Sequence, residues 1–223
     1  MCCFKSMLLL KDRVFIPCYD SHEDMIEACG LDHGPMRENF VRVEITPPDD
    51  DLTVTLDEWS YCVDQDYLPD WYVEEVDKKR CFDALKTWAI KHILIGKSIE
   101  KLTAEDESVI LINSTIKVLD GGTVREVLGG GTVWEVWNGG TVQKVLDGGT
   151  VREVWGGGTV QKVLTGGTVR EVLGGGTVWE VWGGGTVPRQ CGGIVIYSNG
   201  KISVCDKNFY HLVYANDKNS EEK

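Results

Sequence analysis

The 223-residue chain is long enough for one large domain or two modest ones, and a hydrophobic content of 42% indicates that most of it folds. Its formal net charge of −12 lies entirely in residues 1–110, which contain 12 Lys/Arg and 24 Asp/Glu. An acidic first half argues against direct nucleic-acid binding, because phosphate recognition needs clustered basic side chains. It is compatible with a basic protein partner.

The sequence favours a cytoplasmic protein without membrane contact. No apolar run approaches the length of a membrane span. Residues 1–12 hold one short apolar stretch, at 7–10, and lack the pattern of a signal-peptide cleavage site. Eight cysteines without a secretory signal indicate free thiols in a reducing compartment.

Residues 1–110 predict an acidic α+β capping domain. We expect a strand at 13–16, a helix from Ser21 to Cys29, a strand at 40–46, and one or two strands within 52–63. Ser21 begins a capping-box pattern, and Gly30 follows the end of that helix. A second helix is predicted over 71–95 from apolar residues at helical spacing, namely Val73, Val76, Phe82, Leu85, Trp88, Ala89 and Ile93.

Two Cys–His pairs in this domain are candidate metal ligands. Cys18 and His22, like Cys29 and His33, are separated by three residues and are of the types that bind zinc. The spacing differs from that of a common zinc finger, and ordinary thiols and surface imidazoles are the alternative reading. We therefore expect no cofactor, and no histidine has a recognisable nucleophile or paired carboxylate beside it.

Residues 111–190 contain eight copies of a nine-residue repeat, Gly-Gly-Thr-Val-x-x-Val-x-x. Each repeat threonine is preceded by Gly-Gly and followed by Val, at Thr123, Thr132, Thr141, Thr150, Thr159, Thr168, Thr177 and Thr186. Thr and Val favour extended backbone, and one short strand cannot bury its own face, so the repeats must stack. Glycine adopts positive φ at little cost, and we expect both glycines of each pair to do so.

The predicted fold is thus an α+β domain followed by an all-β solenoid, similar to a parallel β-helix or β-roll, with about two repeats per coil. Residues 141–158 match 159–176 at a shift of 18, which favours that coil, but 123–137 also reappear at 168–182. The period alone therefore leaves the coil size open. Residues 191–216 predict a C-terminal capping hairpin around Asn199-Gly200, and 217–223 a disordered tail.

The repeat positions predict an inside and an outside. Both repeat valines are expected in the core, and the Leu or Trp after the second valine at the rim or in an interface. In an 18-residue coil the charged residues form one column of Glu126, Lys144, Lys162 and Glu180, which can pair across coils. The opposite column holds Glu135, Glu153, Glu171 and Arg189, where like charges stack.

This unit resembles the repeat arrays of uncharacterised bacterial and phage-type proteins that join a small N-terminal domain to tandem nine-residue Gly-Gly-Thr-Val repeats. It is also similar to the calcium β-roll unit, which likewise uses two nines per coil. The present repeat departs from that unit because Val124 and its equivalents replace a glycine, and Glu or Lys replaces the ligating Asp. Lys144 and Lys162 cannot bind calcium, so the resemblance implies the shape without the ion.

Five tryptophans of the array are the candidate binding residues, because Trp is costly to expose and enriched in binding hot spots. Trp134 and Trp179 follow an inward valine and should point outward, whereas three others follow the second valine: Trp137, Trp155 and Trp182. They bind a protein partner, or they pack against the N-terminal domain or a second copy.

The favoured function is a non-enzymatic protein-interaction module that presents Trp, Leu and charged columns to a protein partner or to itself as a homo-oligomer. The bacterial and phage-type resemblance implies an inhibitor or decoy that acts on a host protein. The alternative is a small enzyme or metal-binding N-terminal domain with the solenoid as a docking or oligomerisation arm.

Overall fold

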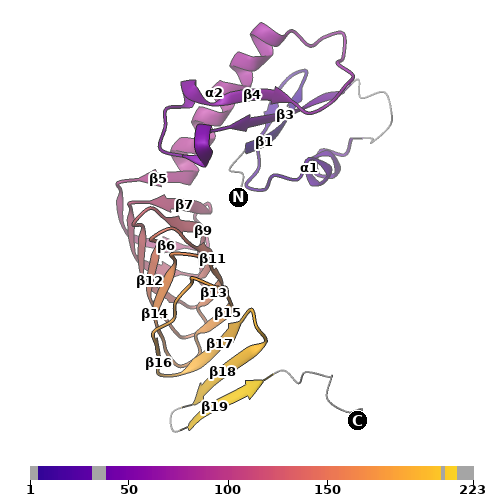
Figure 1. The fold of residues 1–223 in the computed structure, drawn as a ribbon. Helices are drawn as coiled ribbons and strands as arrows, with labels where there is room; N and C mark the ends of the chain where they lie inside the picture. The colour runs from indigo at the N-terminus through magenta and orange to yellow at the C-terminus, as the bar shows by residue number, and fades with distance from the viewer. Residues whose placement is uncertain (1–4, 32–38, 207–208, 215–223) are drawn as a thin grey trace, which may run out of the picture. The chain divides into compact units, whose positions relative to one another are not determined.

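The computed structural model describes residues 5–31, 39–206 and 209–214 (Figure 1) and divides into two compact units, Met1–Ile90 and Lys91–Lys223. It confirms the predicted class, a mixed α and β N-terminal region followed by a β-solenoid. No helix in the described part of the chain is long and apolar enough to cross a membrane.

The N-terminal unit contains a four-stranded antiparallel sheet of order β2-β1-β3-β4. Its strands are β1 (Lys5–Leu10), β2 (Val14–Phe15), β3 (Phe40–Thr46) and β4 (Ser60–Val63), with short 3-10 turns η1 (Pro48–Asp50) and η2 (Leu56–Glu58) between the last two. The bounds of β3 agree with the prediction. Strand β1 is buried along its whole length, so the short apolar stretch at 7–10 is a core strand.

The first helix, α1 (His22–Ala28), begins and ends as its caps predict. The Ser21 hydroxyl accepts a hydrogen bond from the Asp24 amide, 3.2 Å away, and Gly30 has a left-handed φ of 64° just past the end. Its inner face places Met25 and Ile26 in a core with Leu8, Leu10 and Phe40.

The second helix, α2 (Glu74–His92), is shorter than predicted at both ends. The Asp77 carboxylate accepts a 2.8 Å hydrogen bond from the Val73 amide and so holds the first turn. Leu85 and Trp88 are buried as expected. Val73 and Val76 are 53% and 58% exposed, so their placement on the buried face was wrong, because that face begins one turn later.

The solenoid consists of two sheets whose strands alternate along the chain. One is six-stranded, with β6 (Ser98–Thr103), β8 (Thr115–Asp120), β10 (Thr132–Trp137), β12 (Thr150–Val154), β14 (Thr168–Val172) and β16 (Arg189–Gln190). The other is nine-stranded, with β5 (Ile93–Ile95), β7 (Val109–Ile112), β9 (Thr123–Leu128), β11 (Thr141–Val145), β13 (Thr159–Val163), β15 (Thr177–Val181), β17 (Gly193–Tyr197), β18 (Lys201–Asp206) and β19 (Phe209–Tyr214).

Parallel pairing at a shift of 18 establishes two repeats per coil. Thr132 pairs with Thr150 in one sheet, and Thr141 pairs with Thr159 in the other. The repeat valines form one continuous core between the sheets, almost all of them fully buried, as predicted. Identical side chains in successive coils pack without a step in that core.

The coils begin before residue 111, where the sequence analysis placed the boundary. Strand β6 pairs with β8, and β8 pairs with β10, each at a shift of 17, although β6 and β8 lack the Gly-Gly motif. Ile116 and Leu119 occupy the two valine positions and are fully buried. The coil therefore needs only inward apolar residues at the right spacing, and a search for Gly-Gly-Thr-Val misses its first turns.

The two glycines of each pair have different roles, which corrects the expectation that both use positive φ. The first is left-handed, as at Gly148 with a φ of 83°. The second lies outside that region and has no room for a side chain, because a Cβ on Gly149 would lie 1.9 Å from the Val127 carbonyl oxygen of the coil before. The Gly149 amide also closes the turn by donating a 2.8 Å hydrogen bond to the Leu146 carbonyl.

The conformation of the residue before each glycine pair distinguishes two turn types. It is left-handed in four of the seven turns that follow full repeats, with φ of 47° to 55°, at Gly129, Asn138, Asp147 and Gly156. Positive φ at two successive residues is the pattern of a type I′ turn, and Gly, Asn and Asp tolerate it best. Thr165, Gly174 and Gly183 are not left-handed, and a positive φ at the next glycine alone is the pattern of type II.

The C-terminal hairpin is confirmed as β17 and β18, which pair in antiparallel register next to β15. It is followed by a further antiparallel strand, β19, that the sequence analysis did not predict. The predicted disordered tail, 217–223, lies outside the described residues.

Candidate interaction surface

The residue after the first valine of each repeat points away from the core. Trp134 on β10 is 39% exposed and Trp179 on β15 is 56% exposed, whereas the valines before them are fully buried. The outward orientation predicted for these two tryptophans is therefore confirmed. Because β10 and β15 belong to different sheets around one core, the two rings lie on opposite broad faces of the solenoid.

The tryptophans that follow the second valine lie at the two edges where the chain turns between sheets. Trp137 and Trp155 occupy one edge in successive coils, with ring centroids 5.1 Å apart and ring planes 5° apart. Trp182 occupies the other edge and is 46% exposed. The five candidate residues thus form two separate groups, one on the β10 side and one on β15.

The two outward tryptophans differ in how far neighbouring side chains cover them. The guanidinium of Arg152, one coil further along, lies over the Trp134 ring at 4.5 Å from its centroid. Such a cation–π contact satisfies one face of the ring within the molecule. Trp179 takes part in no aromatic pair or cation–π contact recorded among the described residues and is the most exposed tryptophan there.

A hollow of about 510 Å³ lies beside Trp179 on the nine-stranded sheet. Its lining residues come from three successive strands and from the hairpin turn, namely Gln161, Lys162, Trp179, Glu180, Ile196, Tyr197, Ser198 and Gly200. Lys162 and Glu180 pair across coils at 3.5 Å, and the Lys201 ammonium lies over the Tyr197 ring at 5.2 Å. The surface is therefore apolar at the centre and bears charges of both signs.

A register shift of the β-bulge type lies beside this hollow. In the β15–β17 pair, Val178 faces Val195 and Val181 faces Tyr197, so Trp179 and Glu180 together oppose Ile196. Two residues against one bend the bulged strand and redirect its side chains. The sequence analysis named Trp179 but missed Ile196 and Tyr197. The signal for them was that the hairpin follows the last repeat directly and continues its columns.

The charge columns behave as predicted. Lys144 Nζ pairs with the Glu126 carboxylate at 2.7 Å and Lys162 pairs with Glu180 at 3.5 Å, so each lysine of the first column has a glutamate neighbour in the adjacent coil. In the second column Glu135, Glu153 and Glu171 stack in register, and only the last has a basic neighbour in the column, Arg189 at 3.2 Å. Both columns lie in water-facing positions.

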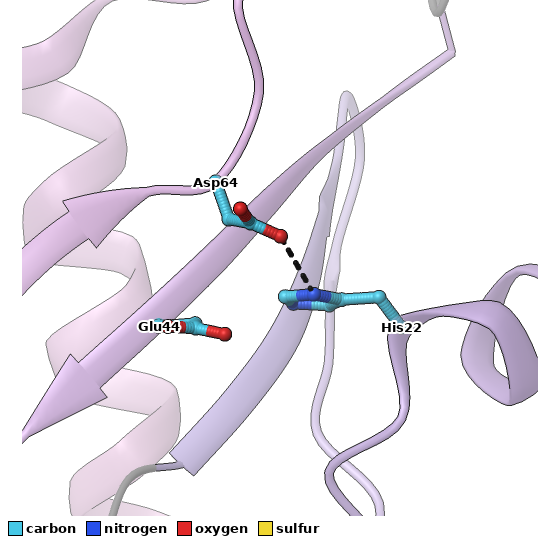
Figure 2. Close-up of side chains that lie close together, drawn as sticks. All are labelled: His22, Glu44 and Asp64. Atoms are coloured by element: carbon cyan, nitrogen blue, oxygen red, sulfur yellow. Dashed lines mark ion pairs between the residues drawn. The ribbon is translucent and has the colours of Figure 1, made fainter.

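The four candidate metal ligands of the sequence analysis, which also allowed ordinary thiols and surface imidazoles, do not form one cluster among the described residues. His33 lies outside the described residues, and Cys18 and Cys29 are half-buried, form no disulfide and join no group of three ligands among the residues described. His22 instead lies with Glu44 and Asp64 (Figure 2). Neither carboxylate was singled out from the sequence, because only the pairing of β3 with β4 brings them to His22.

Two buried groups of the N-terminal unit have ionisation equilibria displaced by their surroundings. Burial raises the pKa of the Cys81 thiol to about 12, so this cysteine stays protonated at neutral pH. Burial and the hydrogen bond to the Tyr72 hydroxyl, 3.2 Å away, raise the pKa of Tyr61. A protonated thiol is a poor nucleophile and a poor metal ligand.

Comparison of the chain with protein-family models, with curated proteins and with solved structures finds no match.

Proposed function

We propose that the chain is a non-enzymatic protein-interaction module, and that the Trp179 surface of its solenoid binds a protein partner. The single observation that supports this most is the 56% exposure of Trp179 beside the hollow on the nine-stranded sheet. Its equivalents in the two preceding coils of that sheet are Gln143 and Gln161. A tryptophan at a water-facing position gains most when a contact removes it from water.

The chemistry of the hollow describes the partner. Trp179, Ile196 and Tyr197 offer apolar and aromatic surface, and Lys162 and Glu180 offer one charge of each sign at its border. This arrangement suits an apolar or aromatic side chain from a protruding protein loop, flanked by polar groups that satisfy the two charges. An acidic N-terminal unit adds long-range attraction for a basic partner.

The wider role that we propose follows from the resemblance of the repeats to bacterial and phage-type arrays. The chain acts in the cytoplasm as an inhibitor or decoy that occupies a surface of a host protein. Its free thiols are consistent with a reducing compartment. The second tryptophan group, around Trp137 and Trp155, provides the surface for self-association into a homo-oligomer.

The experiment compares Trp179→Gln with Trp134→Gln, the same change at the equivalent position of the other sheet. Glutamine already occupies this position at Gln143 and Gln161, so both variants should keep the melting temperature of the wild type. We expect Trp179→Gln to weaken partner binding by about 30-fold, which corresponds to a hot spot of about 2 kcal/mol. Trp134→Gln should change it less, because Arg152 already covers that ring.

The measurements are affinity capture on the immobilised chain, sedimentation velocity over a range of protein concentrations, and thermal melting of each variant. Loss of self-association in Trp179→Gln alone would identify the partner at this surface as a second copy of the chain. Equal binding by both variants and the wild type would contradict the proposal. Unfolding of Trp179→Gln would show that the ring is structural.

A further inference from the structure

Three side chains that are distant in the sequence meet on one face of the N-terminal sheet. His22 is the first residue of α1, Glu44 lies within β3, and Asp64 follows the end of β4. One ligand-type atom from each lies within 4.8 Å of the others. Figure 2 shows the imidazole and the two carboxylates pointing toward one another from these three elements.

The hydrogen bonds of the imidazole determine where its proton lies. His22 Nε2 is 3.3 Å from the Val43 carbonyl oxygen. A carbonyl can only accept, so Nε2 donates and carries the proton. In the neutral ring Nδ1 then presents a lone pair, and it faces Asp64 Oδ2 at 3.4 Å. Two acceptors that face one another require a cation between them, either a second ring proton or a metal ion.

His22 has no means of turning this lone pair toward solvent. Its side chain is only 6% exposed and is held from the other side by the Val43 carbonyl. The Asp64 side chain is 48% exposed, which leaves a route from water to the cluster. Nδ1 of His22 is therefore a buried polar atom directed at a pair of carboxylates, with solvent access from the side of Asp64.

Arg42 is the basic side chain that the structure places against Asp64. Its Nε lies 3.6 Å from Asp64 Oδ2, outside hydrogen-bonding distance, and has no hydrogen-bond partner among the described residues. Arg42 offsets part of the negative charge of Asp64 without donating a hydrogen bond to it. Glu44, on the same face of β3, adds a further acceptor.

We propose that His22 Nδ1 and the carboxylates of Glu44 and Asp64 bind a divalent transition-metal ion. One imidazole nitrogen and two carboxylate oxygens form a mixed donor set that suits Zn²⁺, Co²⁺ or Mn²⁺, whereas Mg²⁺ and Ca²⁺ take oxygen ligands. The bond from Nε2 to a backbone carbonyl is the supporting contact that orients ligating histidines. This site goes beyond the solenoid function proposed above and is independent of it.

The test is a titration of the full chain with Co²⁺, in which binding is measured by calorimetry and by the visible absorption spectrum of the ion. We expect one Co²⁺ to bind per chain at this site. The affinity for Co²⁺ should be roughly 100-fold lower in His22→Gln and in Asp64→Asn. If either of those variants unfolds, Glu44→Gln replaces it as the test of the ligand set, because Glu44 is only half-buried and its substitution should leave the fold intact. Melting curves with and without Co²⁺ should show a shift in the wild type that the variants lose.

His92→Gln is the matched control. His92 also lies between a backbone carbonyl, Ser108 at 2.7 Å, and a carboxylate, Glu107 at 3.0 Å, but it belongs to no group of three ligands among the described residues. Binding should be unchanged in this variant. Cys62→Ser should also retain binding, although Cys62 pairs with Glu44 across the sheet.

Failure of the wild type to bind Co²⁺ would overturn the proposal and leave a proton as the cation at His22. An absorption band of thiolate-to-cobalt charge transfer, or loss of binding in Cys62→Ser, would assign the ion to cysteines and overturn the ligand set. None of these results depends on partner binding by the solenoid, so the two proposals fail separately.

Discussion

Both units contain ion pairs between a lysine and a carboxylate, but only in the solenoid does such a pair recur along the chain. In the N-terminal unit the Lys5 ammonium is buried, pairs with Asp20 and lies over the Trp88 ring, and no second set of described residues in the unit repeats this arrangement. In the solenoid the Lys144–Glu126 pair recurs in the same column as the Lys162–Glu180 pair. Repetition allows a tertiary contact to be predicted from the sequence, because the residue that pairs with each repeat residue in the next coil lies 18 positions away.

The largest effect should come from breaking the buried pair in the N-terminal unit. Asp20→Ala leaves the Lys5 ammonium buried without its carboxylate, and removing one partner of such a pair costs about 3–5 kcal/mol. Glu126→Gln, at the more exposed pair of the solenoid, should cost less than about 1 kcal/mol. Denaturant unfolding followed by circular dichroism measures both. Equal costs would contradict the contrast between the units.

The next largest difference in stability should be between alanine substitutions at the two glycines of one turn. Gly149→Ala should cost about 3 kcal/mol or more, because its Cβ would lie 1.9 Å from the Val127 carbonyl oxygen and the coils must move apart. Gly148→Ala should cost about 1 kcal/mol, the penalty for a left-handed alanine. The free energies of unfolding of the two single variants decide this, and the reverse order would show that backbone conformation matters more than coil contact.

A smaller difference should distinguish deletions of one coil and of half a coil. Removing residues 141–158 keeps every later strand on its own sheet and places Glu126 beside Lys162. Removing 141–149 exchanges the sheets beyond the cut and places Glu126 beside Glu153, a like-charge contact. We expect both chains to fold and the shorter deletion to be less stable than the longer one by on the order of 1 kcal/mol. Thermal melting checks this, and the opposite order would contradict the register.

A slight stabilisation should follow from Gly174→Ala. Gly174 is not left-handed, and a Cβ there would meet no atom within 4 Å. Alanine then lowers the entropy of the unfolded chain without strain, which stabilises by about 0.4–1 kcal/mol. Gly175→Ala, at a φ of 82°, is the control and should destabilise. A lower melting temperature for Gly174→Ala would show that this turn requires glycine at both positions.

Calcium removal should have no effect on the solenoid. The positions that ligate calcium in a β-roll are occupied by Glu or Lys, and Lys144 and Lys162 pair with carboxylates. Addition of a calcium-specific chelator should leave the circular dichroism spectrum and the melting temperature unchanged. A loss of β-structure signal would mean that the repeat binds calcium in spite of this.

Short-range patterns predicted much of the fold. Ser21 capped the first helix, alternation defined β3, and the valines of the repeat formed the core, because each of these depends on residues close in sequence or at a constant spacing. The outward direction of Trp134 and Trp179 followed from the same alternation.

Other features depended on contacts that no local pattern contains. The sequence did not predict that β1 lies in the middle of the N-terminal sheet, that the coils begin at Ile93, or that Trp134 and Trp179 lie on opposite faces. Trp134 and Trp179 lie on opposite faces because successive repeats alternate between the two sheets and an odd number of repeats separates these two residues.

The candidate sites divide in the same way. The sequence by itself determined a solenoid of stacked nine-residue repeats with a valine core and outward Trp134 and Trp179, because every copy of the repeat carries the same pattern. Only the tertiary structure decided that two repeats form one coil. The tertiary structure also decided that a bulge and a hollow lie beside Trp179 and that Asp64 and Glu44 join His22. Each of these arises from a single long-range strand register, whose free energy comes from the packing of the whole sheet and is not encoded in the residues that form the site.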